Sequence, residues 1–371
     1  DNGVGAAAAM AVLEATDLVH GPIEGLFTID EETGMTGANA LEPGVLKGDI
    51  LINMDSETEG ELYVGCAGGI DTCGYFTPKF EDVPAGSKAF QLIVKGLKGG
   101  HSGMDIILGR ANANKVMNAL LLKATEKFNA RVADIQGGSL RNAIPRESFV
   151  TITVPEAKAE ELLAYVPEFE AVVKEQFAAV EPEMSITVVP AEMPAKVIDK
   201  ETIAKLIEAV AKYPNGVIAM SKDFEGTVET SSNLAIVKLV DGQIMTASLQ
   251  RSLVDASKDE LAAEMRKVLE SCGARAESTG SYPGWKPNIN SIIYNTMKKV
   301  YADKYGKTPK TMVIHAGLEC GILGSKYPNW DMVSFGPTLV FPHSPDEALK
   351  IDTVPLFWEF LTETLKNIPV K

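Results

Sequence analysis

The sequence predicts an α/β protein of two domains, one inserted into the other. At 371 residues the chain is longer than a single ordinary domain, since domains cluster near about 100 to 150 residues. Residues 1–68 and 285–371 alternate helical and strand-like segments, some of which end in carboxylates. Residues 69–284 alternate strands and amphipathic helices without acidic ends. We therefore expect a first domain of residues 1–68 and 285–371, interrupted by a second of residues 69–284.

The first domain is predicted to begin with two helix-strand pairs, over residues 4–16, 23–29, 37–41 and 49–53. Both strands are apolar runs that are followed by acidic residues. These are Asp30, Glu31 and Glu32 after the first strand, and Asp55 and Glu57 after the second. Adjacent carboxylates repel and are costly to bury unless a cation or proton compensates them. Ligands of open α/β sheets bind beyond the carboxyl ends of the strands, so this pattern indicates a metal or acid/base site. A solvated acidic turn is the alternative.

The second domain is predicted to contain two copies of a β-α-β-type unit in an α+β arrangement, with a single irregular α+β domain as the alternative. The predicted series is strand 88–97, helix 110–131, strand 148–154, helix 157–179, strand 184–189, helix 200–213, strands 232–239 and 243–249, and helix 258–272.

The last part of the chain again alternates helical and strand-like segments, as residues 1–68 do. It is predicted to run through helix 290–305, strand 310–314, helix 317–323, strand 331–335 and helix 347–366. The start of the terminal helix is placed by Ser344-Pro345-Asp346-Glu347, which offers an N-cap serine, a proline at the first helical position and a glutamate at the third.

Composition excludes several classes of function. Fifty acidic against 35 basic residues give a net charge of −15, which disfavours nucleic acid as a partner. No apolar run reaches the about 18 residues of a spanning helix, so no membrane partner is expected. Four cysteines, Cys66, Cys73, Cys272 and Cys320, make neither a disulfide framework nor a CxxC zinc site. A reducing, cytoplasmic compartment is the prediction.

Three of the four histidines, His101, His315 and His343, lie in glycine- or proline-rich loops. His20 follows the first helix and is given no role. A single loop histidine is usually a surface residue, but three of them beside acid-ended strands favour a site. Carboxylates with an imidazole and no thiolate suit zinc, or manganese and cobalt. A bridging carboxylate with a free carboxylate beside it would serve metal-assisted hydrolysis, in which the free group takes a proton from water.

Seven motifs in order along the chain carry a resemblance. They are Asp1-Asn2-Gly3-Val4-Gly5, Asp30-Glu31-Glu32-Thr33-Gly34, Asn53-Met54-Asp55-Ser56-Glu57, Gly99-Gly100-His101-Ser102-Gly103, Arg141-Asn142-Ala143-Ile144-Pro145-Arg146, His315-Ala316-Gly317-Leu318-Glu319-Cys320-Gly321, and Gly336-Pro337 with Pro342-His343-Ser344-Pro345-Asp346-Glu347. Together they resemble the M20 metallopeptidases, and within them the branch that cleaves Xaa-His dipeptides.

The resemblance implies a zinc-peptidase-like catalytic domain, with a mostly parallel mixed sheet flanked by helices, and an inserted lid through which the chain would form a homodimer. It implies unblocked Xaa-His dipeptides, including carnosine-like ones, as substrates and two Zn²⁺ ions as cofactor, with Mn²⁺ or Co²⁺ as replacements. The implied metal ligands are Asp1 (bridging), Glu32, Asp55 and His343. Glu31 would be the general base, and His101 would polarise the scissile carbonyl. The implied substrate-binding residues are Asn142, Arg251, His315 and Glu319.

The sequence departs from the family at one motif. A His-x-Asp motif, which supplies a further metal ligand upstream of the bridging aspartate, does not occur in these 371 residues. We therefore expect the chain to lack an N-terminal segment of the catalytic domain. Two alternatives stay open at this point: an N-acyl amino acid deacylase of the same fold, and an inactive chain that acts as an assembly or binding protein.

Overall fold

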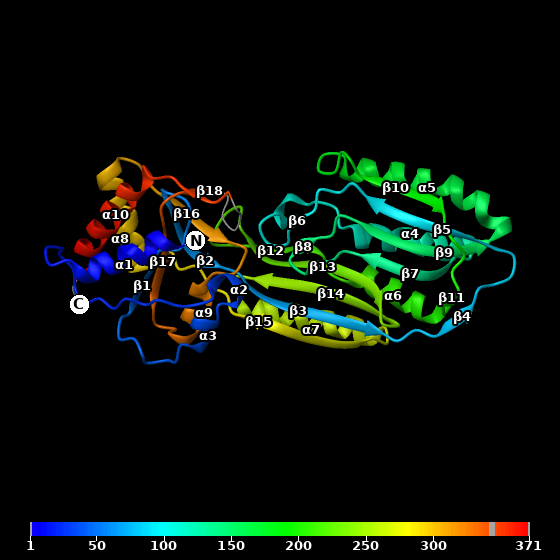
Figure 1. The fold of residues 1–371 in the computed structure, drawn as a ribbon, viewed down its shortest axis with the longest axis horizontal. Coiled ribbons are helices and arrows are strands. Elements are labelled where there is room, and N and C mark those ends of the chain that lie inside the picture. The colour runs from blue at the N-terminus through cyan, green and yellow to red at the C-terminus, as the bar shows by residue number, and fades with distance from the viewer. Residues whose placement is uncertain (1, 341–345, 370–371) are drawn as a thin grey trace. The chain divides into compact units, whose positions relative to one another are not determined.

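The structure, a computed structural model, describes residues 2–340 and 346–369, apart from the side chains of Glu32 and Thr33. The chain divides into two compact units (Figure 1). The first unit comprises Asp1–Gly68 and Tyr282–Lys371, and the second comprises Gly69–Ser281. Within the described residues, no helix is both long and apolar enough to cross a bilayer.

The first unit contains a four-stranded mixed sheet. Its strands, in spatial order, are β1 (Ile50–Asn53), β17 (Asp331–Ser334), β2 (Glu61–Cys66) and β16 (Lys310–Ile314). The β1/β17 and β2/β16 pairs are parallel, and an antiparallel contact between Ser334 and Tyr63 joins the two pairs. The sheet is therefore mixed and mostly parallel, as the sequence predicted.

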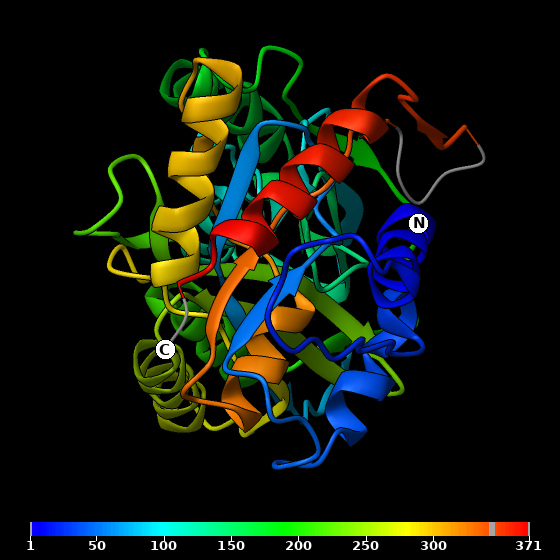
Figure 2. The ribbon, with the colours of Figure 1, turned by 90° about the vertical axis from the view of Figure 1, so that its left-hand side faces the viewer.

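Helices cover both faces of this sheet. Helices α8 (Ile292–Tyr305) and α10 (Thr353–Asn367) pack on each other and lie across one face (Figure 2). Phe335 packs there against aromatic rings of α10. On the other face, Met332 packs with Cys320 of α9 (Glu319–Lys326). Helix α1 (Gly3–Glu14) is capped by Asn2, whose side chain accepts the Gly5 N–H at 3.1 Å.

The second unit is built on one nine-stranded sheet. Along its main path the order is β10 (Ser185–Pro190), β5 (Ser87–Lys95), β9 (Ser148–Pro155), β7 (Arg131–Gly137), β13 (Val228–Val240), β14 (Gln243–Ser252), β3 (Gly68–Phe76) and β15 (Arg275–Tyr282). β12 (Gly216–Met220) pairs with β13 off this path. The four helices of this unit are α4 (Ala113–Phe128), α5 (Glu156–Phe177), α6 (Lys200–Lys212) and α7 (Asp255–Ser271).

Eight of the nine strands, all except β12, form two copies of one β-α-β-β-α-β arrangement. The first copy runs β5-α4-β7-β9-α5-β10, and the second runs β3-α6-β13-β14-α7-β15, with the first inserted after β3. Both have the same spatial order of strands, and the copies join edge to edge where β7 pairs antiparallel with β13. The duplicated β-α-β-type units predicted from the sequence are thus present, and the split βαβ connection explains why neighbouring strands are antiparallel.

The helices of the second unit share one hydrophobic core with the sheet. α4 packs between α5 and α6, and α6 packs on α7. Leu120 of α4, Leu162 of α5 and Leu206 of α6 are all buried in this core. A buried side chain of this size stabilises by roughly 1.5 to 3 kcal/mol, so the apolar stripes of the helices account for their arrangement.

Two sequence predictions about the first unit were wrong. Residues 23–29 form no strand, because among the described residues no neighbouring strand pairs with them. The terminal helix begins at Thr353 instead of residue 347, and residues 348–349 instead form strand β19, which pairs with β18 (Leu339–Val340). Ser344 and Pro345 lie outside the described residues. The residue that favours a helix start here is Pro355, which lies in the first turn of the helix. Proline is tolerated there because the N–H groups of the first turn have no intrahelical acceptor.

Candidate functional site

In the first unit, side-chain hydrogen bonds fix the chain after β1. The Asn53 side-chain oxygen accepts the Ser334 hydroxyl at 2.6 Å and the Asp55 N–H at 3.1 Å. Ser56 and Ser334 share a hydrogen bond of 2.7 Å. A Cβ on Gly336 would lie 1.7 Å from the Ser56 carbonyl oxygen, so only glycine fits there. The ends of β1 and β17 therefore hold the half-buried Asp55 in a defined backbone position.

The start of α1 lies against the same segment. A Cβ on Gly5 would be 2.9 Å from the Met54 carbonyl oxygen. The first turn of α1 thus lies against Met54, the residue before Asp55, close to the acidic end of β1. Asp1 itself lies outside the described residues.

Glu31 is not at the end of a strand. It begins a single helical turn, α2 (Glu31–Gly34), between Asp30 and Met35, whose φ angles of 61° and 54° are left-handed. The Thr36 hydroxyl donates to the Asp30 carboxylate at 2.7 Å, and the Gly37 N–H donates to the Ile29 carbonyl at 3.0 Å. This tight turn, rather than a sheet edge, positions the half-buried Glu31.

His315 and Glu319 are both buried, with 6% and 8% of their surface exposed. They flank the loop between β16 and α9, where the Ala67 N–H donates to the carbonyls of Ile314 and Ala316, each at 3.0 Å. Burial raises the pKa of the Glu319 carboxyl, and Thr28, three residues before Glu31, lies close enough to act in the opposite direction. Glu319 of α9 is therefore near the chain that leads into the acidic turn.

The metal site predicted from the sequence is only partly described. His343, like Asp1, lies outside the described residues, and so does the side chain of Glu32. Within the part of the chain that the structure describes, no group of three His, Cys, Asp or Glu side chains gathers as a metal site. The donors at hand are carboxylates, and Cys320 is fully buried with its pKa raised well above the usual value by that burial. Oxygen donors without an ionised thiol fit a divalent metal.

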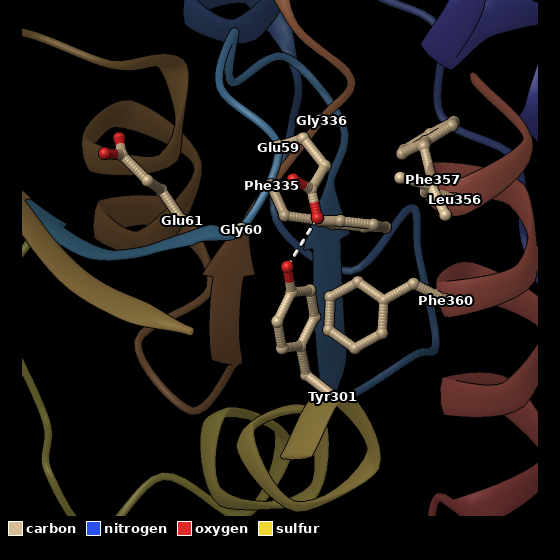
Figure 3. Close-up of a pocket in the computed structure, with 9 residues that line it drawn as sticks. All are labelled: Glu59, Gly60, Glu61, Tyr301, Phe335, Gly336, Leu356, Phe357 and Phe360. Carbon is tan, nitrogen blue, oxygen red and sulfur yellow. Dashed lines mark hydrogen bonds between the residues drawn. The ribbon is translucent and has the colours of Figure 1, made fainter. Parts of the chain in front are cut away.

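A small cavity in the first unit is not a substrate site. It is lined by Tyr301 of α8, by apolar residues of α10, by residues 59–61 at the start of β2, and by residues 335–336 (Figure 3). Its volume of about 10 Å³ holds about one water molecule. The Tyr301 hydroxyl donates to Glu59 across it, and burial, with that carboxylate, raises the pKa of Tyr301. This contact pins α8 to the chain ahead of β2.

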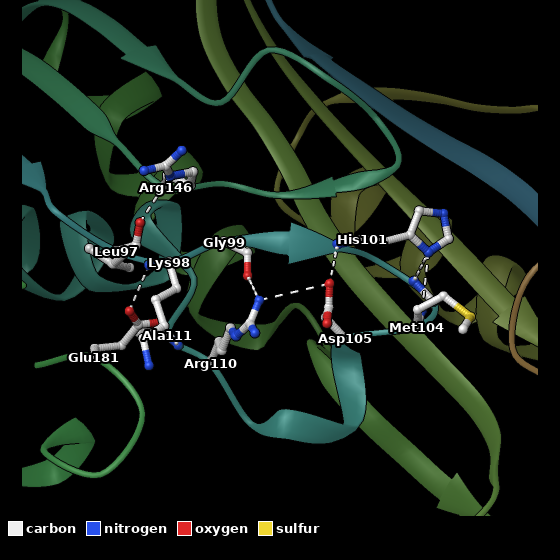
Figure 4. Close-up of polar contacts among 11 residues, drawn as sticks. Leu97, Lys98, Gly99, His101, Met104, Asp105, Arg110, Ala111, Arg146 and Glu181 are labelled. Carbon is white, nitrogen blue, oxygen red and sulfur yellow. Dashed lines mark hydrogen bonds and ion pairs between the residues drawn. The ribbon is translucent and has the colours of Figure 1, made fainter. Parts of the chain in front are cut away.

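In the second unit, a clamped loop presents His101. The short strands β6 (Gly100–His101) and β8 (Ala143–Ile144) pair antiparallel, so that His101 faces Ala143. The His101 N–H donates to Asp105 at 2.8 Å (Figure 4). The buried carboxylate of Glu181 accepts the N–H groups of Lys98 at 2.8 Å and Ala111 at 3.1 Å. Glu181 thus closes the base of the loop that carries His101.

The two glycines before His101 are required by space and by φ. Gly99 and Gly100 have φ angles of 63° and 130°. A Cβ on Gly100 would be 2.4 Å from the Asp105 carboxylate, and one on Gly99 would be 2.3 Å from Arg146. Arg110 also donates to the Gly99 carbonyl and lies 3.8 Å from the Asp105 carboxylate. The Gly-Gly-His motif is therefore a tight turn that fixes the backbone position from which the His101 side chain projects.

The hydrogen bonds of His101 fix its tautomer. Its Nδ1 accepts the N–H groups of Gly103 at 3.2 Å and Met104 at 3.1 Å. The neutral ring must then carry its proton on Nε2, which becomes a donor. Burial lowers the pKa of His101, and the neighbouring Arg251 lowers it further. These contacts thus favour a neutral ring whose proton is on Nε2.

Arg251 and Asn142 lie next to His101. The Arg251 Nη2 lies 3.5 Å from His101 Nε2, and its Nε donates to the Ser102 hydroxyl at 3.4 Å. The Asn142 carbonyl accepts the Ser102 N–H at 2.8 Å. The structure therefore brings together the three residues of the second unit that the sequence singled out.

Sequence reasoning missed the residues that hold this group in place. Ser102 lies inside the glycine-rich motif but received no role. Asp71 on β3 and Arg141 form an ion pair nearby, and nothing in the sequence pairs residues 70 positions apart. Asn233 of β13 supports the turn, because its side chain donates to the Ala143 carbonyl at 2.8 Å.

Comparisons with known proteins identify the class. The chain is 44% identical over 374 residues to the cytosol non-specific dipeptidase of Escherichia coli (strain K12), covering 100% of this chain and 76% of that protein. The crystal structure of aminoacylhistidine dipeptidase from Vibrio alginolyticus matches with a TM-score of 0.96 and 46% identity, covering 100% of this chain and 76% of that one. Residues 92–181 match the peptidase dimerisation domain of M20 proteins.

The fold is thus that of a metallopeptidase. The chain belongs to the M20 family of metallopeptidases. The resemblance inferred from the seven motifs is confirmed. Membership of this family implies a divalent metal as cofactor.

Proposed function

We propose that the chain is a metal-dependent dipeptidase that hydrolyses unblocked dipeptides of the Xaa-His type, carnosine-like ones included. The observation that carries the proposal is the likeness along the whole chain to two proteins, one named a non-specific dipeptidase and the other an aminoacylhistidine dipeptidase. The compartment in the first of these names supports a cytoplasmic location. The match of residues 92–181 supports a homodimer formed through the second unit.

In this proposal the first unit is the catalytic domain and the second is a lid. Asp1, Glu32, Asp55 and His343 would hold a pair of zinc ions, for which Mn²⁺ or Co²⁺ could substitute. A bound metal would supply Lewis acidity and lower the pKa of water. The carboxylate and imidazole donor set, and the fixed backbone at Asp55, support this assignment.

The protein's own groups would carry the proton and hold the substrate. Glu31 would accept the proton of the attacking water and return it to the leaving amine, as a carboxylate outside the ligand set can do. His101 would donate from Nε2 to the carbonyl oxygen as negative charge develops on it. Arg251 and Asn142 would bind the carboxylate and backbone of the substrate, because a guanidinium pairs with a carboxylate through two parallel hydrogen bonds. His315 and Glu319 are the substrate-binding residues that we assign to the first unit.

The test compares substrates and variants with Zn²⁺, Mn²⁺ or Co²⁺ added. We expect β-Ala-His and other Xaa-His dipeptides to be hydrolysed faster than N-acetyl-histidine. Glu31→Gln should lower kcat at least about 100-fold and leave the bound metal unchanged, whereas the exposed Glu42→Gln should match the parent chain.

Three outcomes would contradict parts of this proposal. Preference for N-acetyl-histidine would make the chain a deacylase. Loss of metal in Glu31→Gln would make Glu31 a ligand. A chain that neither binds metal nor turns over any substrate would be a binding or assembly protein.

A further inference from the structure

A second arginine accompanies the proposed substrate-binding pair of the second unit. Arg141 precedes Asn142, and its Nη1 pairs with the carboxylate of Asp71 on β3. The Arg141 side chain is 56% exposed, whereas that of Asp71 is 14% exposed. A largely buried anion thus holds a half-exposed cation. This differs from an ordinary surface ion pair, in which both partners are exposed.

Arg141 sits at the tip of a turn that also carries Asn142. The Ala143 N–H donates to the Leu140 carbonyl at 3.2 Å, so Arg141 and Asn142 are the two central residues. The Asn142 carbonyl accepts the Ser102 N–H at 2.8 Å. The direction of Arg141 is therefore coupled to the backbone that presents Asn142.

Asp71 also reaches the other arginine of the site. Its carboxylate lies within electrostatic range of Arg251 as well as Arg141. The strands that carry Asp71 and Arg251 are neighbours, and a 2.7 Å hydrogen bond between Thr72 and Gln250 joins them. Two guanidinium groups and one carboxylate leave one positive charge, which complements one carboxylate of a ligand.

The geometry of Arg141 leaves it able to bind that ligand. A guanidinium has five N–H donors in a planar fork, and the pairing with Asp71 goes through Nη1. We propose that Arg141 is a specificity-determining residue that recognises the free C-terminal carboxylate of the dipeptide, and that Asp71 is the positioning residue that holds Arg141 for this role. The inference rests on the proposed dipeptidase function.

The experiment measures binding and turnover of two ligands that differ only at this carboxylate, Ala-His and its C-terminal amide Ala-His-NH₂. Binding is measured by calorimetry in the full chain carrying Glu31→Gln, and turnover in the chain with Glu31. We expect the parent chain to prefer the acid. Arg141→Gln should reduce that preference about 10- to 100-fold, since a hydrogen bond to a charged group contributes about 1.5 to 3 kcal/mol. The loss should appear in Kd and KM, with kcat for the acid little changed.

Two further variants separate positioning from charge. Asp71→Asn raises the net positive charge, so a purely electrostatic role would tighten binding of the acid, whereas a positioning role should weaken it and reduce the preference. Arg275→Gln is the matched control, because Arg275 is 60% exposed and pairs with Glu277 at 2.6 Å in the same unit. It should keep the parent preference.

The outcomes distinguish this inference from the proposed function. If Arg141→Gln weakens the binding of the acid and of the amide equally, or changes the binding of neither, Arg141 does not recognise the carboxylate and the inference is overturned. Failure of the parent chain to bind either ligand also overturns it. Preference for the acid in binding, lost in Arg141→Gln, would support the inference even if no variant turned over substrate, and only the dipeptidase function would then fail.

Discussion

At the scale of single residues, His101 shows how two backbone contacts define a chemical state. Protonation at Nδ1 would place a proton against the N–H groups of Gly103 and Met104, which now donate to that atom. The folded state therefore resists protonation, and burial adds to this effect. The ring can donate from Nε2 at neutral pH only because Nδ1 is occupied as an acceptor.

This state predicts a pH dependence. The pKa of His101 is lowered in the folded chain, so the folded state binds fewer protons than the unfolded state just below the ordinary pKa of about 6.5. Folding stability should then fall as the pH drops below about 6.5 and level off below the lowered pKa. Nitrogen-15 NMR of the imidazole should show an unprotonated Nδ1 at pH 7 and a midpoint below that of an unfolded peptide. A midpoint at or above the peptide value would contradict the proposed donor.

For Glu319 we expect the opposite pH dependence of folding stability. Burial raises its pKa in the folded chain, so the folded state binds more protons than the unfolded state. The favourable contribution of the protonated form is present below about pH 4.3 and is lost as the pH rises through the raised pKa. Glu319→Gln should therefore increase the free energy of unfolding at pH 8 by about 1 kcal/mol, and less at pH 5. Urea unfolding at both values tests this, with Glu42→Gln as the control; equal effects at the two values would refute it.

At the scale of elements, the end of α6 depends on a lysine from another helix. Lys115 of α4 donates from Nζ to the carbonyls of Val210 at 2.6 Å and Tyr213 at 2.9 Å, and burial lowers its pKa. These carbonyls belong to the last turn of α6 or follow it, and they have no partner within the helix. A cation there also complements the helix dipole. Lys115 thus joins the two copies of the duplicated unit at their helices.

Removing this cap should destabilise the second unit. Lys115→Met keeps the apolar stem and removes the donors, so we expect a loss of about 2 to 4 kcal/mol in the free energy of unfolding. Lys123→Met, on the same helix and paired with the exposed Glu126, should change it by less than about 0.5 kcal/mol. Thermal and urea unfolding of both variants provide the comparison. Equal effects would show that the cap contributes nothing beyond an ordinary surface pair.

The elements also show what a sequence can predict. Amphipathic helices such as α4 and α6 were found because their 3.6-residue period reflects burial on one face. Strand β7, with β2, β3 and β15, was missed, and residues 23–29 were wrongly assigned to a strand, because strand formation depends on a partner elsewhere in the chain. The candidate site residues divide in the same way: His101 and Asn142 stand in recognisable motifs, whereas Asp71 reaches its site only through sheet pairing. The roles assigned to the candidate residues stay predictions.

At the scale of the whole molecule, the second unit has the features of an autonomous domain. It has its own sheet and its own core. Its chain enters at β3 and leaves at β15, and these strands are neighbours. A Cβ on Gly68 would be 2.6 Å from the Tyr282 carbonyl oxygen, so the two ends of the segment lie side by side. Excision should therefore leave two adjacent ends and no broken core.

We accordingly expect residues 69–281 to fold alone. The isolated segment should unfold cooperatively, with far-ultraviolet circular dichroism typical of mixed α/β structure, because the contacts that stabilise its helices lie within it. Lys115→Met should lower its melting temperature as it does in the full chain, since the cap is internal to the segment. A segment that unfolds without a cooperative transition would show that its core needs the first unit. A cooperative segment insensitive to Lys115→Met would show that it folds, but not with the α4–α6 contact described above.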